Sequence, residues 1–162
     1  MVKRVLAIAV LMYIAFLAEF VLYNAFGSWG KAELIVIAVV FCNLYWGIRY
    51  SLWAAFVAGV LKDAFSTEPF GIYLFVYIVA AFLTTWIRQN LYQPGSRFSR
   101  AVVTFFVLLG IFILEMFIHM RSYEVRLPEA VAYILVPQMA LSMLLVTFVF
   151  HSLRDMVVKL KL

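Results

Sequence analysis

Six polar or charged side chains lie inside long apolar segments of this sequence or at their ends, and these residues could do chemistry. They are Glu19, Lys62, Asp63, Glu115, His119 and Gln138. An ionisable group within a membrane is a functional candidate by default, because it is costly to bury there unless it is paired. If successive apolar segments cross a membrane in alternating directions, all six residues lie toward the outer side and can converge as one polar cluster.

A metal site is the first chemistry to consider for this cluster. Glu115 and His119 are four residues apart and therefore share one face of a helix. With Asp63 they would offer three ligands, but a catalytic zinc site is usually richer in histidine. The other histidine, His151, lies near the opposite side of the membrane. We therefore predict no metal and no cofactor.

A second feature is the stretch around Asp63, where charge, glycine and proline occur together at the edge of two apolar segments. Asp63 ends one segment, a short polar connector follows, and Gly71 precedes the next segment. An aspartate at such a position can accept hydrogen bonds from backbone amides of the connector. We predict a structural hairpin motif of Gly59, Asp63 and Gly71 rather than proton chemistry.

The remaining polar groups have structural interpretations. We expect Lys62 to extend its long side chain to the membrane interface. For Glu19 and Glu115 we expect interhelical hydrogen bonds or partner contacts rather than catalysis, and Asn43 is expected to hydrogen-bond between helices.

A pair of small residues, Ala55 and Gly59, has the small-x-x-x-small spacing that lets another helix come close. We predict that a partner helix packs there.

The composition explains why these groups stand out. Hydrophobic residues make up 67% of the 162 residues and charged residues 13%, whereas soluble domains are about 45–50% apolar and about 25% charged. The sequence therefore predicts an integral membrane protein with one domain over residues 1–162. The single cysteine, Cys42, excludes a disulfide within the chain.

The elements that must position the polar groups are six apolar segments, since a helix satisfies its own backbone in lipid. We predict an all-α bundle of six transmembrane helices at about residues 5–23, 34–48, 51–64, 70–87, 101–120 and 130–150. The first segment is too long for a signal peptide, so we expect it to be retained. The second and third are short for a span of about 20 residues, and a re-entrant hairpin remains an alternative for them.

The basic residues indicate the orientation. If the N-terminus is cytoplasmic, nine Lys or Arg residues lie on the inside and three lie in the outer loops, as the positive-inside rule requires. The sequence therefore predicts cytoplasmic N- and C-termini. It contains no phosphate-binding loop, nucleophile motif or metalloprotease motif, so enzyme activity has little support.

The central stretch resembles the family of the rod shape-determining protein MreD. The resemblance lies in Gly59, Asp63 and Gly71, with the polar connector between the last two, and covers Ala54 to Arg88. Chain length and the basic N-terminus also fit. Lys62 stands where many relatives carry a neutral residue, and Lys31-Ala32-Glu33 stands where relatives often have a proline.

The resemblance implies a non-enzymatic scaffold in the bacterial inner membrane. Such proteins work with MreC, which has one spanning helix, and indirectly with MreB and the glycosyltransferase and transpeptidase that make peptidoglycan. The family's bundle is similar to the substrate-binding components of energy-coupling-factor transporters, and a homo-oligomer is left open. The alternative is a small-molecule (vitamin-like) binding subunit of a membrane transporter, with a site at the outer polar cluster. Nucleic acid is not expected as a partner, because the basic residues are explained by topology.

Overall fold

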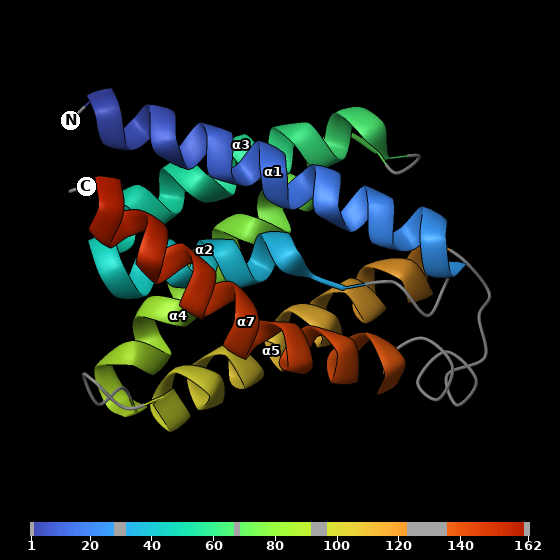
Figure 1. Cartoon of the computed structure of the whole chain (residues 1–162). Coiled ribbons are helices and arrows are strands. Elements are labelled where there is room, and N and C mark those ends of the chain that lie inside the picture. Colours follow the sequence, from blue (N-terminus) through green and yellow to red (C-terminus); the bar gives the residue numbers. More distant parts are fainter. Residues whose placement is uncertain (1, 28–31, 67–68, 92–96, 123–135, 161–162) are drawn as a thin grey trace.

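The computed structural model describes residues 2–27, 32–66, 69–91, 97–122 and 136–160. All regular structure in these ranges is helical and forms six helices. Figure 1 shows them running back and forth. The helices are α1 (Val2–Phe26), α2 (Leu34–Trp46), α3 (Ile48–Phe65), α4 (Ile72–Leu91), α5 (Arg97–Ser122) and α7 (Val136–Leu160). The first and last helices bring the two ends of the chain to the same side of the molecule (Figure 1).

Helix α2 forms the centre of the bundle. It packs against all five other helices, and every residue from Leu34 to Asn43 is buried. A helix that is apolar on all sides is stable only when it is surrounded. The other helices therefore surround α2, and its residues from Leu34 to Asn43 are held in the interior.

Among the described residues, three helical stretches are long and apolar enough to cross a membrane, namely Lys3–Phe26 of α1, Ile72–Asn90 of α4 and Phe98–Ile118 of α5. Helix α2 and the stretch Gln138–His151 of α7 are also apolar but shorter. The lengths and composition of these helices are those expected of an all-helical membrane protein. At 1.5 Å per residue, the 13 residues of α2 extend over about 20 Å.

The helix bounds differ from the predicted ones mainly at the ends. α5 begins at Arg97 rather than residue 101, and α7 continues to Leu160, beyond the predicted end at residue 150. The predicted bounds followed apolar runs, whereas a helix can continue through polar residues where the membrane meets water. The predicted start of the sixth helix, residues 130–135, lies outside the described residues.

The α3–α4 hairpin, formed by α3, α4 and the turn between them, is the most extensively packed pair. Gly59 of α3 lies directly against α4: a Cβ atom at this position would be 2.4 Å from the Cα atom of Leu74. Only glycine allows the two backbones to approach so closely.

Candidate functional site

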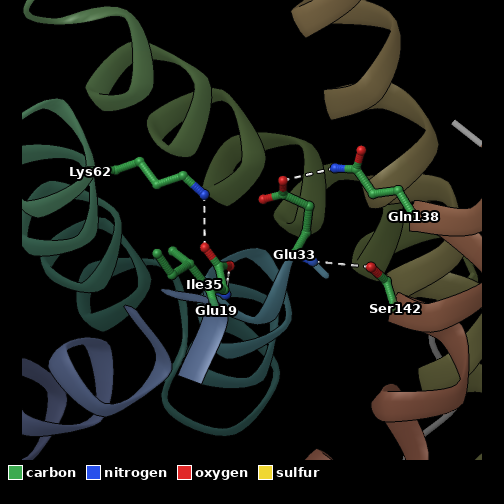
Figure 2. Close-up of polar contacts among 6 residues, drawn as sticks. All are labelled: Glu19, Glu33, Ile35, Lys62, Gln138 and Ser142. Carbon is green, nitrogen blue, oxygen red and sulfur yellow. Dashed lines mark hydrogen bonds and ion pairs between the residues drawn. The ribbon is translucent and has the colours of Figure 1, made fainter. Parts of the chain in front are cut away.

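Five polar side chains meet at the end of the bundle away from the chain termini, and Figure 2 shows their contacts. We call them the polar network; its members are Glu19, Glu33, Lys62, Gln138 and Ser142. Glu19 lies on α1, Glu33 directly precedes α2, Lys62 lies on α3, and both Gln138 and Ser142 lie on α7. The network therefore joins four separate parts of the chain.

One half of the network is an ion pair between α1 and α3. Lys62 Nζ lies 2.7 Å from Glu19 Oε2, and Ile35 N donates to Glu19 Oε1 at 2.8 Å. The Glu19 carboxylate thus accepts a hydrogen bond from one of the amides at the N-terminus of α2 that have no partner within the helix. Negative charge is favourable at this end of a helix. Lys62 Nζ also lies 5.5 Å from the centre of the Tyr73 ring.

This pairing corrects the expectation that Lys62 reaches the membrane interface. Its side chain is 23% exposed and that of Glu19 is 9% exposed. A buried carboxylate is strongly destabilising without a counter-charge, and Lys62 supplies that charge from the adjacent helix. Glu19 has the interhelical contact expected for it.

The other half of the network connects Glu33 to α7. Glu33 N donates to Ser142 Oγ at 3.1 Å, and Gln138 Nε2 donates to Glu33 Oε1 at 2.9 Å. The second carboxylate oxygen of Glu33 is buried and has no hydrogen-bond partner among the described residues. Sequence reasoning missed Glu33 and Ser142 as site residues. The available signal was that Glu33 directly precedes the most apolar segment of the chain.

A small cavity lies beside Glu33 and Gln138, and Glu115 of α5 contributes to it. Its volume is about 10 Å³, and its walls are Glu33, Leu108, Ile111, Phe112, Glu115, Gln138, Met139 and Ser142. This is about the space of one water molecule, far below the roughly 300–1,000 Å³ of pockets for small organic ligands. Glu115 and Gln138, two of the six residues proposed to converge, therefore line the same small cavity.

His119 lies one turn beyond Glu115 on α5, but its side chain is outside what the structure describes. Within the described ranges, no group of three His, Cys, Asp or Glu residues is placed to hold a metal ion.

Asp63 directly follows Lys62 on α3, and its carboxylate binds backbone amides of the turn and of α4. It accepts hydrogen bonds from Gly71 N at 3.0 Å, Tyr73 N at 3.0 Å and Leu74 N at 3.1 Å. These are amides at the N-terminus of α4, which have no partners within the helix. Gly71 has φ +104°, a conformation that favours glycine. The side chain of Asp63 thus ties the end of α3 to the start of α4.

The small-residue pair Ala55 and Gly59 does not face outward. Both residues are buried within the bundle, and Gly59 contacts Leu74 of α4. The helix that uses this close approach belongs to the same chain. A partner protein cannot reach these two residues in this structure, which corrects the predicted partner-helix packing.

At the opposite end of α2, Asn43 has the interhelical hydrogen bonds expected for it. Its Nδ2 donates to Ala81 O at 2.9 Å and to Thr85 Oγ1 at 2.8 Å, and Arg88 Nη1 donates to Asn43 O at 2.7 Å. Sequence reasoning treated Arg88 only as a topology signal. Its guanidinium instead caps the C-terminal end of α2, where a cation is favoured.

Comparison with protein families gave one match over nearly the whole chain. The model of a family described as rod shape-determining protein MreD matches residues 1–156. Comparisons with curated proteins and with solved structures found no match. The matched region includes the polar network, the α3–α4 hairpin and the contacts around Asn43.

Proposed function

Since the chain belongs to the MreD family of rod shape-determining membrane proteins, we propose that it is a non-enzymatic scaffold of the bacterial cell-elongation machinery. In this proposal it lies in the inner membrane and binds an MreC-like protein with a single spanning helix. Through that partner it couples MreB filaments to the glycosyltransferase and transpeptidase that make peptidoglycan.

The observation that carries the scaffold proposal is the use of the buried polar groups. Glu19 and Lys62 pair with each other, Asp63 binds backbone amides, and Asn43 and Arg88 connect α2 to α4. These side chains hold helices together instead of converging on an open site. Such an interior supports a fixed bundle whose function lies on its surface.

The alternative, a small-molecule binding subunit of a transporter, has less support. It needs a cavity large enough for a ligand such as a vitamin, about 300–1,000 Å³. The cavity that Glu33, Glu115 and Gln138 line has a volume of only about 10 Å³. The space beside Glu33 fits a water molecule, so the scaffold is the better interpretation.

A partner helix would have to dock on the outer surface, because the predicted packing pair is buried. Helix α1 offers a long apolar face, with Leu6 66%, Val10 51% and Val21 61% exposed. Association of helices in lipid depends on van der Waals packing and interhelical hydrogen bonds. We propose that the partner packs against the lipid-facing surface, with α1 as its first candidate.

The orientation is also part of the proposal. Eight of the 13 Lys and Arg residues lie in described segments at the end of the bundle that carries both termini. The positive-inside rule places such an end in the cytoplasm. The polar network and the turn after Asp63 would then lie toward the periplasm.

Photo-crosslinking in the native host tests the proposal. A photoreactive amino acid at Val10, on the exposed face of α1, should crosslink to a single-span periplasmic protein. The same substitution at Phe41, which is fully buried in α2, provides the matched control and should give no crosslink. Depletion of the chain should convert rods to spheres. Recovery of a coupling subunit with paired ATPases, without cell-wall proteins, would refute the scaffold and favour the transporter.

A further inference from the structure

A second and larger cavity lies between α5 and α7, toward the end that carries the chain termini. Its volume is about 510 Å³. We call it the α5–α7 groove; its walls are Arg100, Ala101, Leu144, Val146, Thr147, Phe148, Phe150 and His151. Leu144 and Phe148 are 74% and 72% exposed, so the groove opens outward along an apolar face.

The groove has a cationic end. Arg100 Nη1 donates to Tyr45 Oη at 3.0 Å, and the guanidinium lies 5.9 Å from the centre of the Phe150 ring. These two contacts orient the guanidinium but use only one of its five N–H donors. Among the described residues, no carboxylate forms an ion pair with Arg100.

The position of Arg100 along the bundle matches the depth of a lipid headgroup. It is the third residue of the long apolar stretch Phe98–Ile118, and His151 is the last residue of the apolar stretch Gln138–His151. The polar residues of the groove therefore lie where apolar helix gives way to the interface. Leu144 lies about two turns further into the apolar part of α7.

The charge of this end favours an anion. The described segments at this end contain eight Lys or Arg residues and one acidic residue, Asp155. Basic pockets between helices on the cytoplasmic side of a membrane are sites where anionic lipid headgroups bind. Arginine binds phosphate through its planar array of N–H donors.

We propose that the α5–α7 groove binds one anionic phospholipid. Its phosphate accepts hydrogen bonds from Arg100, and one acyl chain lies along Leu144 and Phe148. A soluble phosphate would leave these apolar walls uncovered, whereas a lipid covers both parts of the groove. This inference does not depend on the scaffold proposal, because it rests on the groove and on the basic charge of this end of the bundle.

Thermal unfolding of the purified full-length chain in detergent tests the inference. Phosphatidylglycerol and phosphatidylcholine with identical acyl chains are added separately, and inorganic phosphate is added in a third sample. A ligand of the folded state raises the melting temperature. We expect phosphatidylglycerol to raise it at least about twice as much as phosphatidylcholine does, and phosphate to have no effect.

Two variants and one control locate the binding site. Arg100→Gln should abolish most of the preference for phosphatidylglycerol. Arg49→Gln removes an exposed basic residue at the same end, outside the groove, and should keep the preference. Thr147→Trp fills the groove without changing its charge and should also abolish the preference. Thr147 is exposed, so this variant should melt near the wild-type temperature without lipid.

Three results would overturn the inference. The first is an equal shift with the two lipids, or a shift with phosphate alone. The second is an equal loss of preference in Arg100→Gln and Arg49→Gln, which would indicate attraction to the whole basic end. The third is a full preference retained by Thr147→Trp. If Arg100→Gln does not fold, Thr147→Trp alone decides between lipid binding in the groove and attraction of the lipid to the whole basic end.

Discussion

The α3–α4 hairpin and the α5–α7 pair are both formed by helices that follow each other among the described elements, yet they are held together differently. In the hairpin, Gly59 lets two backbones touch, and Asp63 binds three amides of α4. The α5–α7 pair packs less extensively and leaves a groove of about 510 Å³ at one end.

The difference indicates which part of the bundle is fixed and which is open. The close contact of two backbones at Gly59 and the hydrogen bonds from three amides to the buried Asp63 carboxylate fix the position of α3 against α4. A groove with apolar walls and an oriented guanidinium leaves α5 and α7 able to accept a further molecule. We therefore expect substitutions in the hairpin to cost stability and substitutions in the groove to change binding.

The largest loss of stability is expected for Gly59→Leu. A side chain there meets the Cα atom of Leu74, which belongs to the backbone and cannot rotate away. Overpacking of this kind costs about 1–3 kcal/mol and sometimes more, and we expect about 3 kcal/mol. Unfolding by sodium dodecyl sulfate in mixed micelles measures this free energy.

Gly110 provides a matched control for this site. An added Cβ at Gly110 meets only the end of the Leu83 side chain, at 2.6 Å, and that side chain can move. Gly110→Ala should therefore be clearly more stable than Gly59→Ala. Equal stability of the two alanine variants would show that the close approach in the hairpin is not a constraint.

The next largest effect is expected for Lys62→Met, which breaks the link between the hairpin and α1. The substitution leaves the buried Glu19 carboxylate without its counter-charge. Removal of one partner of a buried pair costs about 3–5 kcal/mol; because Lys62 is partly exposed, we expect about 2–3 kcal/mol. The double variant Glu19→Gln with Lys62→Met should recover part of this loss in the same unfolding assay. A double variant less stable than Lys62→Met would contradict the pairing.

Asp63→Ala is expected to cost about 2 kcal/mol, because it removes a helix cap that serves three amides. Asp63→Asn keeps one carbonyl oxygen as an acceptor and should lose about half as much. Hydrogen exchange at the start of α4 is the specific measurement: amides of Gly71, Tyr73 and Leu74 should lose protection. Unchanged protection in Asp63→Ala would argue against the cap.

The smallest effect is expected on the other side of the comparison, for Leu144→Ala in the groove. Leu144 is 74% exposed, so its truncation removes little internal packing and should change the free energy of unfolding by less than about 0.5 kcal/mol. A loss as large as that of Asp63→Ala would mean that α5 and α7 are held as firmly as the hairpin.

Much of this fold follows from the sequence. The six helices and their order, the turn at Gly71 and the interhelical role of Asn43 were predictable, because each depends on residues close in sequence or on the cost of burying polar groups. Alternating helix direction predicts in addition that Glu19, Lys62, Glu115 and Gln138 lie toward the same end of the bundle, without saying which of them pair.

The pairings within the site could not be predicted in the same way. Glu33 binds Gln138 and Ser142, which lie 105 and 109 positions away, and no local pattern specifies such contacts. Lys62 was misjudged because its position at a helix end says nothing of Glu19, 43 positions earlier. Whether Ala55 and Gly59 face a partner protein or another helix of the same chain likewise depends on how the helices pack. The sequence around these two residues does not specify that packing.

The central position of α2 has a consequence for the order in which the protein is made. Asn43 and its partner Arg88 are 45 positions apart, a delay of about 2–9 s at a synthesis rate of about 5–20 residues per second. During that interval the side-chain amide and the end of α2 lack the hydrogen bonds that α4 will supply. The ribosome thus completes α2 before it makes α3, α4, α5 and α7, the helices that later surround α2. Until α4 has been made, the polar groups of Asn43 need other hydrogen-bond partners.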